Sequence, residues 1–285
     1  MCKKFRRKTQ IYHPTMRYYL STIALCFFIT ATTFGTNTHH LLGLNPRVQA
    51  LAFMYPAQAQ LIFDASNEAN AYTDQFFGAG AQSQNDNSSN AFRHSLWNAL
   101  AVKKLKDAGA NDATANDIVQ QFTSAYEYND AGTALVKTAA SAMDLHNNLV
   151  GRSFKNYTTI NQLLDSLFLK AIEPKVITAT LSQILTSHNA DVNTAWNLLE
   201  NTDSSNLEVS RFLVRIDPCT VSLLLTHSIA NTVKFEVSTF IQAQNTLSAT
   251  AKVTYDAQNY VLLNPGFKAD QGSTFAAYVD GCGNK

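Results

Sequence analysis

The sequence predicts an α+β multidomain protein, in which an all-α helical bundle is followed by a small all-β module of solenoid-like or sandwich form. The first observation is that apolar residues recur at spacings of three and four over residues 45–200, as amphipathic helices require. The second is that Val, Thr, Phe and Tyr become common after Asp217-Pro218 and alternate with polar residues, as strands require. We therefore expect a helical domain at 36–216 and a β module at 217–285.

The N-terminal segment, residues 1–35, has the composition of an export signal. It contains six basic and no acidic residues, and an uncharged apolar run extends from Leu20 to Phe34. A basic stretch followed by a short apolar run is typical of a secretory signal peptide, which predicts a secreted or cell-surface protein. One alternative is a membrane anchor over residues 18–38, because a spanning helix needs about 20 apolar residues. The other alternative is a buried core helix.

The composition narrows the class of protein. The chain has 285 residues, of which 46% are hydrophobic and 15% are charged, so a mostly disordered chain is excluded. Outside residues 1–35 the acidic residues outnumber the basic ones. This balance argues against a protein that binds nucleic acid by neutralising phosphates, and we expect no nucleic-acid partner.

Helix starts and ends are marked along residues 45–200. Pro56 fits the first position of a helix, one of the residues 88–90 fits an N-cap, and Gly109 fits a helix end. Short connections between helices favour an antiparallel bundle. We expect helices over residues 56–77, 91–109, 112–128, 131–150, 159–172 and 175–187, with a weaker one over 195–200.

The β module contains a weak internal repeat of a large apolar residue, one outward residue and Ala. Large and small side chains that alternate inward predict short stacked strands, in a solenoid-like or a sandwich arrangement. Cys219 and Cys282 bracket the module, and two such cysteines in an exported protein predict a disulfide. The alternative is two unrelated buried thiols. The repeat units are Ile241-Gln-Ala243, Tyr255-Asp-Ala257, Phe267-Lys-Ala269 and Phe275-Ala-Ala277.

A specific set of apolar and turn residues runs through this module, namely Tyr255, Ala257, Leu262, Pro265-Gly266-Phe267, Ala269, Gly272-Ser273, Phe275, Ala277 and Cys282. With these residues the module resembles the three-coathanger stack domain, which is found in secreted proteins of Bacteroidetes-type bacteria. The resemblance implies an accessory β module at the cell surface or outside the cell. It implies no chemistry.

Polar side chains lie on the inward-facing sides of three successive predicted helices. In the first of them, His94 and Asn98 are one turn apart on one face, beside Arg93 and Trp97. Polar groups of this kind need partners if they are buried. A purely structural interpretation is a buried network around Arg93 that fixes the helix register, with Trp97 in the core.

The later helices supply groups that complete such a cluster. Glu127 lies near the end of the helix expected over 112–128, and Asp144 and Asn148 are four residues apart on the next helix, with Asn147 beside them. Four polar side chains on inward faces are more than an ordinary core contains, so we expect them to share one shell, with Arg93 at its edge. The expected members of this shell are His94, Glu127, Asp144 and Asn148.

Three blocks of the helical domain form a distinctive set: Asn90-Ala-Phe-Arg-His94 with Trp97-Asn-Ala99, then Ala125-Tyr-Glu127, then Met143-Asp-Leu-His-Asn-Asn148 with Gly151-Arg152. With these blocks, residues 55–155 resemble the bacterial domain of unknown function 6973 (DUF6973). Tyr126 stands where that family is expected to have His. The resemblance implies no settled activity.

These residues support functions of two classes. We favour an exported binding or structural protein, in which Asn98, Asn147, Asn148 and Trp97 contact an unknown ligand. Its partner is then in the cell envelope or outside the cell, and the membrane is reached only through an uncleaved N-terminal segment. We expect no cofactor in either class, although a hard divalent cation would suit carboxylate and amide oxygens.

The alternative class is a hydrolase of phosphodiester or acyl esters, which includes an effector of this activity. His94 would be its general base, because a positioned imidazole most often has that role. Asp144 would orient His94, or would hold a cation together with Glu127 and Asn148. Arg93 would stabilise the negative charge that develops in the transition state.

Overall fold

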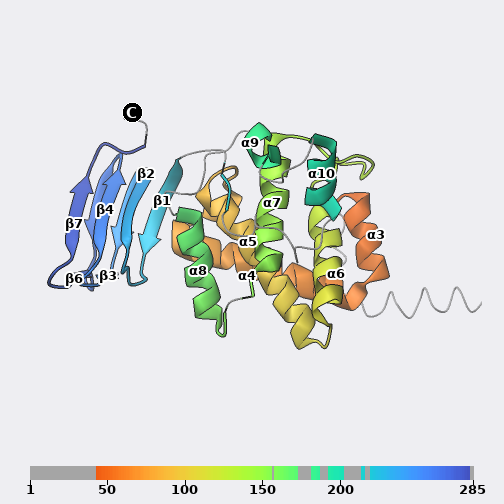
Figure 1. Ribbon diagram of the computed structural model, residues 1–285, viewed down its shortest axis with the longest axis horizontal. Coiled ribbons are helices and arrows are strands. Elements are labelled where there is room, and N and C mark those ends of the chain that lie inside the picture. Colours follow the sequence, from red (N-terminus) through yellow and green to blue (C-terminus); the bar gives the residue numbers. More distant parts are fainter. Residues whose placement is uncertain are drawn as a thin grey trace, which may run out of the picture. The chain divides into compact units, whose positions relative to one another are not determined.

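The described chain begins as a series of helices, as the periodicity predicts (Figure 1). The computed structural model describes residues 43–155, 157–172, 181–186, 192–201, 213–215 and 219–282. The expected signal or anchor segment lies outside these residues, and so does the expected domain boundary at 216–217. The described helices and strands all belong to one compact unit, Asn45–Lys285. The helices are α3 (Pro46–Met54), α4 (Pro56–Phe77), α5 (Ser88–Asp107), α6 (Asp112–Ala125), α7 (Ala139–Ser153), α8 (Ile160–Ile172), α9 (Leu181–Thr186) and α10 (Val192–Asn201), with a 3-10 turn, η1, at Ala81–Ser83.

The start of α5 is set by a side-chain cap. Asn87 Oδ1 accepts hydrogen bonds from the backbone N–H groups of Ser89 and Asn90. This cap satisfies donors that the first turn of a helix leaves without a partner. The helix therefore begins at Ser88, earlier than expected, because the residue before the predicted cap positions does the capping.

The helix expected over 131–150 begins only at Ala139, so that boundary was wrong. Asn129 Oδ1 accepts a hydrogen bond of 2.9 Å from Thr133 N, which forms a local turn in place of the first helical turns. Gly132 has a φ of 67°, in the left-handed region that a right-handed helix excludes. Asn side chains compete with helix formation in this way because they bond to nearby backbone groups.

The remaining helices are found with shifted ends. α6 ends at Ala125, short of the expected 128, and α10 extends beyond the expected 195–200 in both directions. The helix expected over 175–187 is described only as α9, and its other residues lie outside the described part of the chain. Within the described ranges, no helix combines the length and the apolar character that crossing a bilayer requires.

The central helix is α5, which packs against α4, α6, α7 and α8. Its approach to α7 is closest at Gly151, where an added Cβ would lie 2.1 Å from the backbone oxygen of Ser95. On the side of α4 and α8, aromatic rings fill the core next to α5. These rings are Phe76, Phe77, Phe92 and Phe168.

The C-terminal part is a stack of parallel strands (Figure 1). The larger sheet has the order β1-β2-β4-β7, with β5 also paired to β2, and β3 pairs with β6 in a second sheet. Every pairing between the strands is parallel, so the module is solenoid-like, which was one of the two expected forms. The strands are β1 (Thr220–Leu225), β2 (Thr232–Ala243), β3 (Thr246–Leu247), β4 (Lys252–Ala257), β5 (Tyr260–Leu263), β6 (Lys268–Ala269) and β7 (Thr274–Tyr278).

The strand register explains why the sequence repeat is weak. Tyr255 is paired with Phe235 on one side and with Ala277, not Phe275, on the other. One repeat unit therefore sits two residues out of step with the next. Because alternate residues of a strand point to the same face, a shift of two keeps the same side chains inside. The ring of Tyr255 still contacts both aromatic neighbours, at centroid distances of 5.5 Å to Phe235 and 5.0 Å to Phe275.

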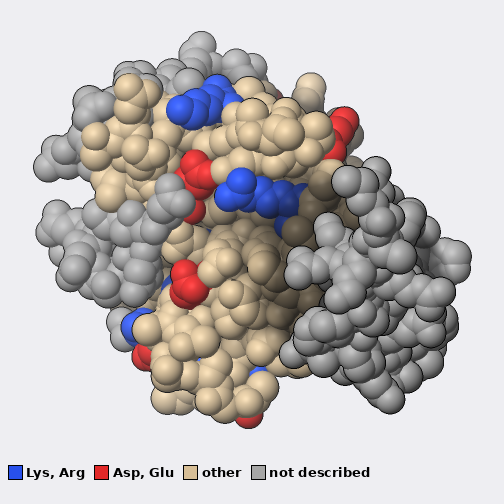
Figure 2. Space-filling model, turned by 90° about the vertical axis from the view of Figure 1, so that its right-hand side faces the viewer, with Lys and Arg blue, Asp and Glu red and all other residues tan. Residues whose placement is uncertain are grey.

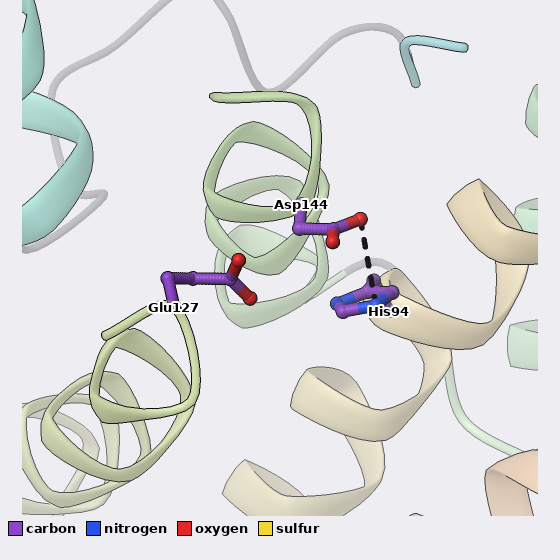
Figure 3. Close-up of side chains that lie close together, drawn as sticks. All are labelled: His94, Glu127 and Asp144. Carbon is purple, nitrogen blue, oxygen red and sulfur yellow. Dashed lines mark ion pairs between the residues drawn. The ribbon is translucent and has the colours of Figure 1, made fainter. Parts of the chain in front are cut away.

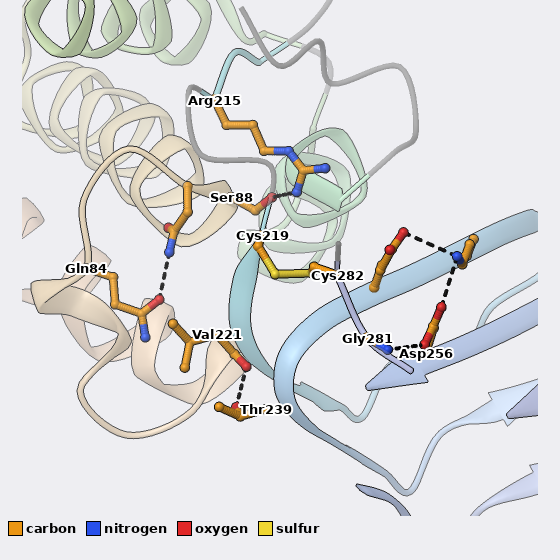
Figure 4. Close-up of a disulfide and its surroundings, with 12 residues drawn as sticks. Gln84, Ser88, Arg215, Cys219, Val221, Thr239, Asp256, Gly281 and Cys282 are labelled. Carbon is orange, nitrogen blue, oxygen red and sulfur yellow. Dashed lines mark hydrogen bonds and ion pairs between the residues drawn. A yellow bond between two sulfur atoms is a disulfide. The ribbon is translucent and has the colours of Figure 1, made fainter. Parts of the chain in front are cut away.

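The predicted disulfide between Cys219 and Cys282 is present (Figure 4). Cys219 directly precedes β1 and Cys282 follows β7, and these strands stand at opposite ends of the sheet order. The C-terminal segment is held on its return by Gly281 N, which donates a 2.8 Å hydrogen bond to Asp256 Oδ1 on β4. A structural disulfide indicates an oxidising environment.

The β module rests on the helical core at α4. Ser222 Oγ of β1 donates a 2.8 Å hydrogen bond to the backbone oxygen of Phe77. The His227 ring stacks on Phe76 at 4.5 Å, and its Nε2 lies 3.0 Å from Asp165 Oδ1 of α8. The aromatic core of the helices thus continues to the first strand of the module.

Candidate functional site

Three side chains with acid–base or metal-binding chemistry converge between α5, α6 and α7. His94 lies on α5, Asp144 lies on α7, and Glu127 lies in the turn that follows α6. A ring nitrogen of His94 and one carboxylate oxygen of each acid lie within 4.8 Å of one another. Figure 3 shows the three side chains pointing toward one another from three separate segments.

Asn148 joins this group on the other side of the imidazole. Its Oδ1 lies 3.1 Å from His94 Nδ1, while His94 Nε2 lies 3.4 Å from Asp144 Oδ1. Asn98 Nδ2 donates to Asn148 Oδ1 at 2.6 Å and to the backbone oxygen of His94 at 2.9 Å. The imidazole is therefore held at Nδ1 by the amide of Asn148 and faces Asp144 with Nε2.

Arg93 lies at the edge of the cluster and is linked to it by Asn90. With its amide nitrogen toward Asp144, Asn90 places that nitrogen 2.8 Å from Oδ1 and its oxygen 2.9 Å from Arg93 Nη2. The negative charges of Asp144 and Glu127 both act on Arg93 and raise its pKa, against the larger effect of burial. One guanidinium thus partly balances two carboxyl groups.

Two of the expected ligand-binding residues make other contacts. The indole Nε1 of Trp97 donates a 3.0 Å hydrogen bond to the backbone oxygen of Ile62, and the ring packs edge-on against Tyr126 at 5.1 Å. Asn147 bonds to both backbone groups of Val214, at 2.8 Å and 2.9 Å. These contacts connect α5 and α7 to neighbouring segments. Trp97 also borders the cluster, because its ring lies edge-on to the His94 ring at a centroid distance of 6.3 Å.

Sequence reasoning missed several polar residues that surround the cluster. Arg152 is 1% exposed, and its Nη1 donates to Asn98 Oδ1 at 3.1 Å and to Thr123 Oγ1 at 3.3 Å. Ser141 forms a hydrogen bond with Glu127 that lowers the pKa of that carboxyl. One signal for Arg152 was available, because it follows Asn148 by four residues and so shares its helix face.

Burial raises the pKa of both carboxyl groups. The pKa of Asp144 is raised to about 7 by burial, with Arg93 opposing the shift and the charge of Asp86 adding to it. The pKa of Glu127 is raised well above its ordinary range, first by burial and then by the charge of Asp144. Two carboxylates held this close disfavour full ionisation of both, unless a cation is present.

The imidazole is neutral at physiological pH. Burial and, to a lesser extent, the charge of Arg93 lower the pKa of His94 to about 3, while the hydrogen bond to Asn148 opposes the shift. The 3.4 Å contact between His94 and Asp144 is therefore not an ion pair with a protonated ring. A neutral imidazole leaves one ring nitrogen with a free lone pair, which can accept a proton or bind a metal.

Solvent reaches the cluster only in part. The side chains of His94 and Asp144 are 10% and 16% exposed. A hollow of about 450 Å³ lies away from the cluster, between α3, α6 and α10. Arg47, Asp117 and Glu200 contribute to its lining. Figure 2 shows that acidic and basic side chains are interspersed on the described part of this face, without a basic patch of the kind that binds nucleic acid.

The comparisons with known proteins match the helical part. A family model described as a domain of unknown function (DUF6973) matches residues 49–180, which supports the similarity expected for 55–155 and extends it at both ends. The matched segment contains His94, Glu127, Asp144 and Asn148. No curated protein and no solved structure matches the chain.

Proposed function

We propose that the helical domain is a divalent-cation-binding domain, and that His94, Glu127 and Asp144 supply its protein ligands. The observation that carries this proposal is the convergence of one imidazole nitrogen and two carboxylate oxygens, from three segments, within 4.8 Å. The geometry around His94 supports it, because Nδ1 is bonded to Asn148 and Nε2 faces the carboxylates. A metal-binding His is commonly oriented by such a hydrogen bond at its second nitrogen.

The set of donor atoms suits a first-row divalent cation such as Mn²⁺ or Zn²⁺. Imidazole nitrogen is a common ligand for these ions, whereas Ca²⁺ and Mg²⁺ favour oxygen ligands alone. With bonds of about 2.1 Å, ligand atoms around one ion lie roughly 3.0–4.2 Å apart. The cluster is slightly wider than this, so small side-chain movements would close it around an ion. The proposal departs from the expectation that no cofactor is needed.

The electrostatics support the same assignment. Burial raises the pKa of Asp144 and of Glu127, and the charge of Asp144 adds to the shift at Glu127, so both acids hold protons more tightly than ordinary carboxyl groups do. A divalent cation would replace these protons, and its affinity should therefore increase with pH. Arg93 balances part of the negative charge and leaves room for one further positive partner.

A hydrolase is the second candidate, and the position of Arg93 favours it. Its guanidinium lies beside the carboxylates, where it could stabilise an anionic ester in a transition state. A bound cation would supply a Lewis acid for this reaction. Without a cation, the lone pair of His94 Nε2 would be the general base, as the sequence suggested.

We propose that the protein is located outside the cytoplasm. The disulfide between Cys219 and Cys282 supports a secreted or cell-surface protein, because such bonds persist in oxidising compartments. The β module would then be an accessory surface module, as its resemblance to the three-coathanger stack domain implies. Its parallel, solenoid-like form supports a spacer or attachment role and adds no chemistry.

The binding proposal is tested by calorimetric titration of the full-length, chelator-treated chain with Mn²⁺ and with Zn²⁺. We expect one site per chain, weakened at least about tenfold in Glu127→Gln and in Asp144→Asn. Glu68→Gln is the matched control, because this exposed carboxylate pairs with Lys104 on the surface and should not affect binding. Absence of a site, or a site that neither cluster variant weakens, would contradict the proposal.

The hydrolase candidate is tested separately on a panel of phosphodiester and acyl ester substrates. Turnover that is lost in His94→Asn and Arg93→Gln but unaffected in Glu68→Gln would support it. If turnover occurs without any bound cation, the general-base version is favoured. If no member of the panel is hydrolysed by a chain that binds the cation, the binding function stands alone.

A further inference from the structure

A chain of hydrogen bonds leads from a buried arginine to the imidazole of the candidate site. It runs from Arg152 in the last turn of α7, through Asn98 on α5 and Asn148 on α7, to His94 on α5. All four residues are buried, with whole-residue exposures of 8% or less. The direction of each hydrogen bond in this chain can be derived from its first member.

The first step is fixed because a guanidinium can only donate hydrogen bonds. Arg152 Nη1 lies 3.1 Å from a side-chain atom of Asn98, and that atom must therefore be the amide oxygen. Thr123 Oγ1 lies 3.1 Å from the same oxygen, which a hydroxyl donor can satisfy. The amide nitrogen of Asn98 must then point the opposite way.

The second step passes this orientation to Asn148. The nitrogen of Asn98 lies 2.9 Å from the backbone oxygen of His94, which confirms its role as a donor. It also lies 2.6 Å from a side-chain atom of Asn148, which must accept and is therefore the oxygen. Asn148 keeps this orientation although its own Nδ2 is buried and has no hydrogen-bond partner among the described residues.

The third step assigns the proton on the imidazole. Asn148 Oδ1 can only accept, and it lies 3.1 Å from His94 Nδ1, so Nδ1 must carry a hydrogen. A neutral imidazole has a single N–H, which this hydrogen bond places on Nδ1. Nε2 is then left with its lone pair directed toward Asp144, at 3.4 Å.

We propose that Arg152 is a positioning residue that fixes the tautomer of His94 through Asn98 and Asn148, and so keeps a lone pair on Nε2. Arg152 touches neither carboxylate and needs no contact with a ligand. The consequence for cation affinity rests on the proposed function, whereas the tautomer itself does not. The tautomer can therefore be correct even if no cation binds.

The wild-type tautomer is measured directly by long-range ¹H–¹⁵N correlation of the histidine rings in the full-length, metal-free chain at neutral pH. The His94 signals are identified by their loss in His94→Asn. We expect the Nδ1–H form. An Nε2–H form in the wild-type chain overturns the proposal without any need for a further variant.

Asn98→Asp tests the direction of the relay. This nearly isosteric change puts an acceptor on both sides of residue 98, so Asn148 should turn its nitrogen toward the new carboxylate and toward His94 Nδ1. His94 Nδ1 then becomes an acceptor, and we expect the ring to change to the Nε2–H form. Mn²⁺ affinity should fall at least about tenfold, although no ligand has been altered. A folded variant that retains the Nδ1–H form overturns the proposal.

The role of Arg152 in fixing the tautomer is tested by comparing the variants Arg152→Gln and Arg152→Lys. Arg152→Gln offers both a donor and an acceptor, so the tautomer should become mixed, whereas Arg152→Lys keeps a donor and should restore the Nδ1–H form. Arg47→Gln, an exposed arginine outside the relay, is the matched control and should leave the ring unchanged. An unmixed Nδ1–H form in Arg152→Gln overturns the role of Arg152. If the wild-type chain does not bind Mn²⁺, the proposed function is refuted, but the tautomer proposal is not.

Discussion

The helical domain and the β module fill their interiors in opposite ways. Around α5 the helices bury His94, Asn98, Asn148 and Arg152 in one hydrogen-bonded group. The stacked strands bury mainly ladders of apolar side chains, with single polar residues such as Asn245 and Asp256 between them. Asn245 accepts the hydrogen bond of the buried Tyr255 hydroxyl. Buried polar groups are costly unless every one is paired, and packing of helices does not require them. The contrast supports the proposal that the polar group of the helical domain has a chemical role.

The largest expected effect is a loss of stability in the β module that leaves the helical domain unchanged. Replacement of both cysteines, Cys219→Ala with Cys282→Ala, should destabilise the β module by about 4 kcal/mol, because the bond closes a loop with a sequence separation of 63. Both tryptophans, Trp97 and Trp196, lie in the helical part, so their fluorescence reports that part alone. Limited proteolysis should cut the module of the variant, while the urea transition of the tryptophans changes little. A parallel loss of both signals would show that the domains unfold as one unit.

The next prediction concerns the close packing of α5 against α7 in the helical domain. Gly151→Ala should destabilise the helical domain by about 3 kcal/mol or more, because the added methyl group would overlap the backbone of Ser95. The measurement is urea unfolding followed by tryptophan fluorescence. Gly43→Ala is the control, because nothing lies within 4 Å of a Cβ at that position. Equal stability of the two variants would mean that α5 and α7 do not cross as closely as described.

A pH dependence distinguishes the polar cluster from an apolar core. The pKa of Asp144 is about 7 in the folded chain against an ordinary 3.8, so the folded state binds this proton more tightly than the unfolded state. The stabilisation is complete below about pH 4 and is lost as the pH rises through about 7. Relative to wild type, Asp144→Asn should therefore gain roughly 3 kcal/mol between these limits, measured by urea unfolding with a chelator present. A difference that is constant with pH would refute the shift.

The smallest expected effect concerns the β module. Tyr255→Phe removes the 2.9 Å hydrogen bond to Asn245 Oδ1 and should cost about 1 kcal/mol, which thermal unfolding can measure. Tyr260→Phe is the control, because this side chain is 43% exposed. If Tyr255→Phe destabilises the module by several times this amount, its interior depends on polar groups more than the comparison allows.

Most of the helical fold could be predicted because it depends on local signals. Helix periodicity, Pro56 and the one-turn spacing of His94 with Asn98 are visible in the sequence. The late start of α7 was missed because the turn at Asn129 uses side-chain bonds that periodicity does not show. The parallel register of the β module was left open because strand pairing is decided by residues far apart in the chain.

The members of the site could be predicted only where they share a helix face. Asp144 and Asn148 met that condition, and the structure brings both to His94. Arg152 shares the helix face of Asn148 and was still missed, because its contact with Asn98 depends on the close crossing of α7 over α5 at Gly151. Such a crossing is a tertiary feature, and no spacing within one helix indicates it.

The measurement that tests the central claim most directly is anomalous diffraction from crystals of the chain grown with Mn²⁺. The account predicts one strong peak among the three side chains, within about 2.3 Å of His94 Nε2 and of an oxygen from Glu127 and from Asp144. It also predicts that the peak is absent from crystals of Glu127→Gln grown under the same conditions. A map without density at this cluster, or with Mn²⁺ bound only elsewhere, would contradict the claim that the helical domain binds a divalent cation there.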